Sequence, residues 1–228
     1  MRNVKRTVNN LRRRTLAAVC AMGMACVATG AAPPQNAKQL LAAFTEKING
    51  ATSLEMTFAL TFENPAKGLL RNYEGTLLCS GAKYRLLTDE SDIYSDGRNK
   101  WLCNKETNEV YIQYVSDDES VDITDNPLRF LASCQKDFNY KQKGDRREEN
   151  GRTLVDIEFT PKNRQAAYTS IVLTLDAGTA YPNAILYVTK SGRYTIRITR
   201  ITPDVEVFDG YFAFPKHRYP GIEIIDLR

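Results

Sequence analysis

Apolar and polar side chains alternate strictly along much of the chain after residue 53. Every second position is apolar over at least five residues in the segments 54–62, 110–114, 155–159, 171–175 and 194–198. A period of two with one apolar face predicts antiparallel strands that are buried on one side only. Turn-forming pairs such as Asn64-Pro65 and Asp96-Gly97 separate these segments. The pattern therefore predicts a mainly β protein.

A helical pattern comes before the first strand. Asn36 and Gln39 form a capping box, Gly50 can end the helix, and the apolar residues between them share one stripe: Leu40, Leu41, Phe44 and Ile48. A second, short helix is expected after Asp125 or Asn126, because Pro127 suits its first position. Its apolar side would consist of Leu128, Leu131 and Cys134.

These elements together predict an α+β fold with one large sheet. An antiparallel sheet of about ten strands must curl, and its apolar face must be covered. We therefore expect a single curved antiparallel sheet that forms an unclosed half-barrel, covered by two or three helices.

The first thirty-two residues have the pattern of a secretory signal peptide. A basic segment ends at Arg14, the uncharged apolar run 16–28 follows, and small residues lead to Pro33-Pro34. The apolar run is shorter than the roughly 20 residues that a membrane-spanning helix needs. Cleavage is expected after Gly30 or Ala32. Ala25-Cys26 resembles a lipoprotein attachment site only weakly, because Gly23-Met24 precedes it. We expect residues 1–32 to be removed and residues 33–228 to form one exported domain in the periplasm.

Removal of this leader changes the charge of the protein. The whole chain has 31 Lys and Arg against 27 Asp and Glu, a net charge of +4. The leader contains six cations and no acid, so the remaining chain has a net charge of −2. A nucleic-acid-binding protein would keep a basic face, so this class of function is not expected.

Three cysteines, Cys79, Cys103 and Cys134, remain after the leader, at spacings unlike any metal or redox motif. Two of them could pair in an oxidising compartment, with Cys79 and Cys103 on neighbouring strands as the candidate pair. Small apolar residues in a core are the simpler interpretation, and we expect three buried, reduced thiols.

Residues typical of catalysis are scarce. His217 is the single histidine and lies among Lys216, Arg218 and Tyr219, whereas triads and zinc sites need a histidine with partners at defined spacing. The acidic segment 117–125 lacks the EF-hand spacing. We expect no enzyme, no metal and no cofactor, although two carboxylates converging in space, as in a hydrolase, would leave no linear signature.

Two groups of residues resemble a known family. The first is Tyr94-Ser95-Asp96-Gly97 followed by Trp101, and the second is Phe212-Ala213-Phe214-Pro215 followed by the segment 219–226. In this order, with Tyr73-Glu74-Gly75 before them, they resemble LolA, the periplasmic carrier of outer-membrane lipoproteins, over nearly the whole exported chain. Where the family often has an Arg-Pro pair, this chain has Gly81-Ala82.

The resemblance implies a half-barrel whose apolar cavity shields lipoprotein acyl chains beneath a helical lid. It implies acylated lipoproteins, an inner-membrane lipoprotein-releasing transporter and an outer-membrane acceptor as partners, with the carrier itself a monomer. A lipid- or lipoprotein-sensing module on the same fold is the alternative function. If an arginine of the family pair helps to hold the lid, the lid is controlled differently here.

The alternating strands supply candidate residues for such a cavity. The residues expected to line it are Leu54, Met56, Phe58, Leu60, Phe62, Trp101, Ile171, Leu173, Leu175, Tyr194, Ile196 and Ile198. The residues expected on the lid are Leu40, Phe44, Ile48 and Leu131. An ordinary packed core is the alternative for each of them.

Overall fold

The computed structural model describes residues 36–115, 138–163, 166 and 168–228. All of them belong to the compact unit Pro33–Arg228. The leader, the acidic segment and the predicted second helix with Leu131 and Cys134 lie outside the described residues.

The predicted first helix is present as α1 (Ala37–Gly50). Asn36 caps it, since its side-chain oxygen accepts a hydrogen bond of 2.9 Å from the backbone N–H of Gln39. Leu40, Leu41 and Phe44 are fully buried, so the predicted stripe is the face that packs against the sheet. Three short 3-10 helices accompany it in the described part of the chain: η1 (Pro65–Lys67), η2 (Asp209–Phe212) and η3 (Lys216–Arg218).

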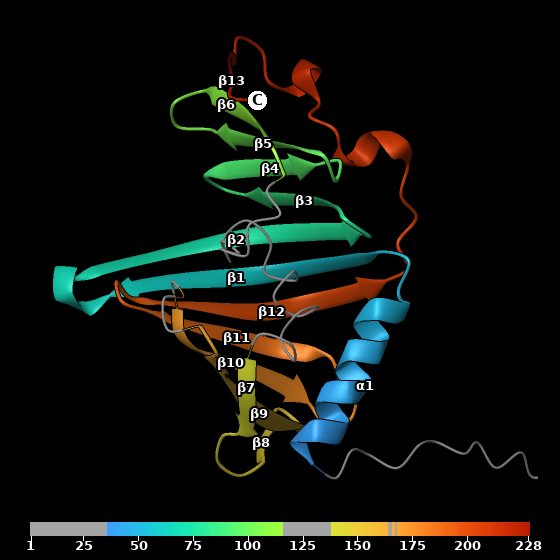
Figure 1. The fold of residues 1–228 in the computed structure, drawn as a ribbon, viewed down its shortest axis with the longest axis vertical. Coiled ribbons are helices and arrows are strands. Elements are labelled where there is room, and N and C mark those ends of the chain that lie inside the picture. Colours follow the sequence, from blue (N-terminus) through green and yellow to red (C-terminus); the bar gives the residue numbers. More distant parts are fainter. Residues whose placement is uncertain (1–35, 116–137, 164–165, 167) are drawn as a thin grey trace, which may run out of the picture. The chain divides into compact units, whose positions relative to one another are not determined.

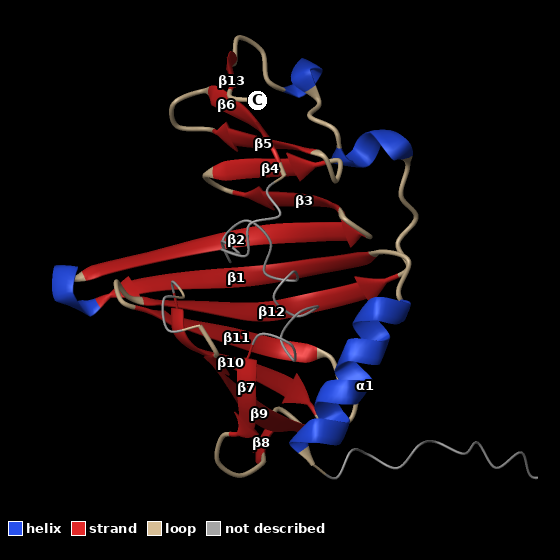
Figure 2. Cartoon of the chain, in the orientation of Figure 1, coloured by secondary structure: helices blue, strands red, loops and turns tan. Residues whose placement is uncertain are grey.

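The strands in the described part of the chain form one sheet of 13 strands (Figures 1 and 2). They are β1 (Leu54–Asn64), β2 (Leu69–Ser80), β3 (Lys83–Thr88), β4 (Ser91–Ser95), β5 (Asn99–Asn104), β6 (Glu109–Tyr114), β7 (Phe138–Gln142), β8 (Arg147–Glu149), β9 (Arg152–Pro161), β10 (Tyr168–Asp176), β11 (Pro182–Thr189), β12 (Arg193–Pro203) and β13 (Glu223–Asp226).

The strand order is β13-β6-β5-β4-β3-β2-β1-β12-β11-β10-β9-β7, with β8 paired to β9. Every pairing is antiparallel except that of β13 with β6. Strands β1 to β6 form one meander and β9 to β12 form another, and the two are joined where β1 pairs with β12. The edge strands β13 and β7 do not pair with each other. The prediction of a large, unclosed antiparallel sheet with helical cover is therefore confirmed.

The register separates the two faces of the sheet. Met56 pairs with Leu77 and Leu77 with Leu86, so these residues share the face on which α1 packs, here called the inner face. Tyr94, Trp101 and Val110 have the opposite parity and lie on the outer face.

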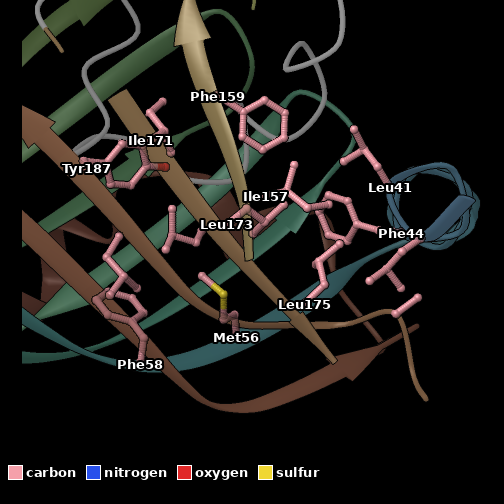
Figure 3. Packing of buried hydrophobic residues seen from close by; sticks show 14 of the residues in the cluster. Leu41, Phe44, Met56, Phe58, Ile157, Phe159, Ile171, Leu173, Leu175 and Tyr187 are labelled. Atoms are coloured by element: carbon pink, nitrogen blue, oxygen red, sulfur yellow. The ribbon is translucent and has the colours of Figure 1, made fainter. Parts of the chain in front are cut away.

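The main core lies on the inner face beside α1. Figure 3 shows Leu41 and Phe44 of α1 pointing toward Ile157 and Leu175, with Met56 close by. The backbone order of the meander brings strands β9 to β12 and β1 together here, and their alternating apolar residues fill the space between the sheet and the helix.

Candidate functional site

A cavity of about 440 Å³ opens on the inner face where the strands β1, β2 and β12 extend away from α1. Its apolar lining comes from alternate positions of these strands and consists of Phe58, Leu60, Phe62, Leu69, Tyr194 and Ile196. We call this cavity the hairpin pocket, because the β1–β2 hairpin supplies most of its wall. Its volume is within the range of about 300–1,000 Å³ typical of small-ligand sites.

The register explains why these residues meet. Leu60 is opposite Ile196 on β12 and opposite Tyr73 on β2, so side chains from three strands converge on the same face. Phe62 stacks on Tyr194, with ring centroids 4.5 Å apart. This stacked pair forms an apolar wall that stays partly exposed.

Gly75 shapes the inner end of the pocket. It lies opposite Phe58 in the β1–β2 ladder, and a Cβ atom at this position would lie 2.6 Å from the Phe58 ring and 2.9 Å from the carbonyl oxygen of Leu87. Only glycine leaves room for the Phe58 ring to lie over the strand. Phe58 is thereby held at the boundary between the pocket and the core.

The rim of the pocket is polar. It is formed by Arg71, Tyr73, Thr88, Glu90 and Ser91. The hydroxyl of Thr88 donates a 2.8 Å hydrogen bond to the carbonyl oxygen of Ser91, which fixes the β3–β4 turn. A hydrogen bond with Tyr73, with a smaller effect of the nearby Glu90 carboxylate, raises the pKa of Arg71. An apolar floor with a polar rim suits an amphiphile better than a purely polar ligand.

The predicted cavity residues fall into two sets that overlap, since Phe58 and Ile196 line the pocket and also belong to the buried core. Phe58, Leu60, Phe62, Tyr194 and Ile196 line the hairpin pocket. The sealed core beside α1 contains Leu54, Met56, Ile171, Leu173 and Leu175.

The remaining predicted residues lie at the margins. Ile198 packs against the core from its edge and borders a second, polar cavity of about 210 Å³. The predicted lid residues Leu40 and Phe44 of α1 are fully buried, and Ile48 of the same helix is partly buried. This helix therefore covers the core and not the pocket.

Trp101 does not join either set. It lies on the outer face, where it packs with Tyr94, Cys103 and Val110. The assignment of Trp101 to the cavity wall is therefore wrong, because the register pairs it with Tyr94 and Ile112, on the face opposite to Phe58.

The chain end covers this outer cluster. Phe214, Tyr219 and Ile222 pack against it, so the two sequence groups that carried the family resemblance are in contact. The carboxylate of Asp96 holds the turn between β4 and β5 by accepting hydrogen bonds from the backbone N–H groups of Arg98 and Asn99, at 2.8 and 2.7 Å. These motifs are structural and lie away from the pocket.

A buried polar network fastens the chain end. The hydroxyl of Tyr219 donates to the buried carboxylate of Asp92 and is 2.9 Å from the hydroxyl of Tyr94. Lys105 forms an ion pair with Asp92 at 2.8 Å. Burial, together with the hydrogen bond to the Asp92 carboxylate, raises the pKa of Tyr219. Sequence reasoning missed this network, since its members are widely separated along the chain.

The two described cysteines are free and cannot form a bridge. β3 and β4 separate the strand of Cys79 from that of Cys103, which corrects the expectation that they lie on neighbouring strands. Cys79 is on the inner face and Cys103 on the outer face. Burial raises the pKa of each thiol to about 12.

Groups that could carry other chemistry are few among the described residues. His217 is exposed on η3, and the described ranges contain no cluster of three or more His, Cys, Asp or Glu side chains suited to a metal ion. No helix in the described part of the chain is long and apolar enough to span a membrane. The hairpin pocket is thus the candidate site.

Comparison with known proteins identifies the family. Residues 81–215 match the family described as outer membrane lipoprotein carrier protein LolA. The protein belongs to the LolA family. A search of curated proteins gives no match.

Several solved structures are similar to this chain. An uncharacterized conserved protein from Thermus thermophilus superposes with a TM-score of 0.53 at 8% identity, over 83% of this chain and 98% of that chain. A LolA superfamily protein from Nitrosomonas europaea gives a TM-score of 0.44 at 12% identity, over 80% and 100% of the two chains. MucB, in the MucA/MucB complex from Pseudomonas aeruginosa, gives 0.42 at 18% identity, over 78% and 60%.

The LolA family match begins at Gly81, in the β2–β3 turn. Gly81 has a φ of 57°, and both Gly81 and Ala82 are exposed. The left-handed conformation favours glycine, so here this position serves a tight turn.

Proposed function

We propose that this protein is a periplasmic carrier that shields the acyl chains of lipoproteins in the hairpin pocket on their way between the inner and outer membranes. The observation that carries the proposal is the apolar pocket of about 440 Å³, which opens on the inner face of a LolA-family sheet beside the core on which α1 packs. Release from an inner-membrane lipoprotein-releasing transporter and delivery to an outer-membrane acceptor complete the proposed route.

The energetics of acyl chains explain why such a pocket is needed. Each exposed CH₂ group costs about 0.8 kcal/mol in water, so a lipoprotein with several chains needs a carrier to cross an aqueous space. A carrier must also release its cargo. A pocket that is only partly enclosed, with the Phe62–Tyr194 wall still exposed, covers the chains incompletely and permits release.

The location is part of the proposal. The basic, apolar and small-residue segments of residues 1–32 direct the chain to the envelope. Intact-mass measurement of protein from the periplasmic fraction tests this step. We expect an N-terminus between Ala31 and Pro33 without an acyl group, and a chain that begins at an acylated Cys26 contradicts it.

Binding of a fluorescent fatty acid tests the pocket. Leu60→Glu places a carboxylate in the apolar lining, where it should lower probe affinity at least tenfold, because an acyl chain beside it would desolvate the charge. Ala59→Glu is the matched control, since Ala59 is the neighbouring residue on the outer face of β1. It should bind the probe like the wild-type protein. Mass spectrometry of lipids that co-purify with the exported protein identifies the natural cargo. A wild-type protein that binds neither probe nor lipid contradicts the carrier function.

A further inference from the structure

The tip of the β1–β2 hairpin is exposed, apolar and basic. Figure 1 shows this hairpin reaching beyond the ends of the neighbouring strands. Its turn is η1, followed by Gly68 in the left-handed conformation and by Leu69 and Leu70. Leu69 points into the hairpin pocket, whereas the side chain of Leu70 is 60% exposed. The tip therefore presents an uncovered leucine, which lies opposite Glu63 on the outer face of the hairpin and points away from the pocket.

Exposed basic side chains lie on the hairpin tip and on the turn beside it, and the one carboxylate opposite Leu70, that of Glu63, is paired with Arg193. Lys67 is on the tip itself, and Lys190 is on the neighbouring β11–β12 turn, which adjoins the hairpin because Arg193 forms an ion pair with Glu63. Both lysines are exposed, and neither forms an ion pair with any of the described residues. Arg71 adds a third cation at the pocket rim.

The opposite side of the pocket entrance is acidic. The β3–β4 turn carries Asp89 and Glu90, and the β5–β6 turn carries Glu106. All three are exposed. Lys105 on the acidic side is paired with Asp92, and Glu63 on the basic side is paired with Arg193. The unpaired charges at this end of the sheet are therefore divided, with cations on the protruding hairpin and the turn beside it and carboxylates on the turns beyond the pocket. An anionic surface would attract the hairpin and repel the other side.

We propose that the hairpin tip docks on an anionic lipid bilayer, with Leu70 inserted at the interface and Lys67 and Lys190 against lipid head groups. Basic residues are attracted to anionic lipid surfaces, and exposed apolar side chains partition into the interfacial region. Leu69 and Phe62, which line the pocket, lie within the same hairpin. An acyl chain could then pass between bilayer and pocket along the inner face of the hairpin. This inference gives the proposed carrier a way to exchange its cargo, and it rests on the proposed function in that respect alone.

Vesicle co-sedimentation of the exported protein tests the docking. The vesicles contain phosphatidylcholine alone or an equal mixture with phosphatidylglycerol. We expect binding to the anionic vesicles and at least tenfold weaker binding to the neutral ones, with a decrease at high ionic strength. Replacing Lys67 and Lys190 by Glu should weaken binding at least tenfold, because each cation near the surface contributes about a fivefold change in affinity. Lys83→Glu, at the exposed first residue of β3 and at the other end of β2, should leave it unchanged.

The apolar contribution has a closely matched control. Leu70→Ser should weaken binding to anionic vesicles several-fold. Leu227 is 61% exposed, almost the same as Leu70, but lies beyond β13, and Leu227→Ser should have no effect. Equal loss in both variants, or equal binding to both kinds of vesicle, overturns the inference.

Measurements without vesicles separate this inference from the carrier function. The Leu70→Ser protein should bind the fatty-acid probe in buffer like the wild-type protein, because Leu70 is outside the pocket, while uptake of probe from anionic vesicles becomes slower. If wild-type protein binds the probe in buffer but does not sediment with anionic vesicles, the docking inference fails and the carrier function stands. If it sediments but binds no probe, the docking stands and the carrier function fails.

Discussion

The two ends of the inner face have the same sequence pattern and different structures. Along β1, Met56 is fully buried beside α1, whereas Phe62, six residues further on the same face, stays partly exposed at the pocket. The strands do not differ in periodicity between these ends; among the described residues, they differ in whether α1 packs on them. Leu40, Leu41 and Phe44 of α1 belong to the core, and no residue of α1 lines the pocket. A binding pocket can thus arise where a regular apolar face extends beyond its cover.

The sharpest test of this difference is the same acidic substitution at both ends. Leu173→Glu buries a carboxylate in the sealed core, where Leu173 has no exposure, and should cost more than about 4 kcal/mol or prevent folding. Leu60→Glu should cost less than about 2 kcal/mol, because water can reach the open pocket. Urea denaturation followed by circular dichroism measures both. Equal losses would mean that the pocket is as tightly packed as the core.

The boundary between the two regions depends on Gly75. Gly75→Ala should cost about 1–3 kcal/mol, because the new methyl group forces the Phe58 ring or the Leu87 backbone to move. Phe58→Leu in the same chain should restore part of this loss by removing the ring. A double-mutant cycle from denaturation curves gives the coupling. Simple additivity would show that Gly75 acts through the backbone of β3 and not through Phe58.

Loss of the N-terminal cap of α1 should lower the stability of the protein without changing the pocket. Asn36→Ala removes the hydrogen bond to Gln39 and should lower the free energy of unfolding by about 1 kcal/mol. Affinity for the fatty-acid probe should not change, since α1 does not line the pocket. Asn36→Ser, which keeps a capping oxygen, serves as the control. A change of probe affinity in the alanine variant would give α1 a role at the pocket.

The smallest expected effect is on the rate of thiol labelling, which measures how accessible the inner face is at Cys79 and the outer face at Cys103. A thiol with a pKa of about 12 has a thiolate fraction of roughly 10⁻⁴ at pH 8, and the thiolate is the reactive form. In a chain with Ser at positions 20, 26 and 134, iodoacetamide should therefore label Cys79 and Cys103 slowly in the native state. Labelling should become fast in urea. Rapid native labelling of Cys79 alone would show that the inner face opens.

The sequence predicted which residues share a face of the sheet better than it predicted whether each residue lies in the core or in the pocket. Alternation placed Leu54 to Phe62 on one face of β1 and identified the buried stripe of α1, because periodicity follows directly from strand and helix geometry. It could not show where the cover ends, which depends on the position of α1 in three dimensions. Leu173 and Leu60 are therefore equivalent by alternation alone, although one is in the core and the other in the pocket.

Trp101 shows a second limit. The residue lies on a strand, as its surroundings suggested, but the face of a side chain depends on its parity along the strand and on the turns that connect it to its neighbours. The pairing of Trp101 with Tyr94 places it on the outer face. The parallel pairing of β13 with β6 was equally hidden, because it joins segments more than a hundred residues apart.

The ladder between β1 and β12 has a consequence for how the molecule forms. Within each meander the strands pair mostly with near neighbours in sequence, but the hydrogen bond from the Thr199 side chain to the carbonyl oxygen of Thr57 spans 142 residues. Folding slows as contacts join more distant residues. Two quickly formed half-sheets should therefore wait for one slow joining event, and β1 keeps an unpaired edge until Pro203 has been synthesised.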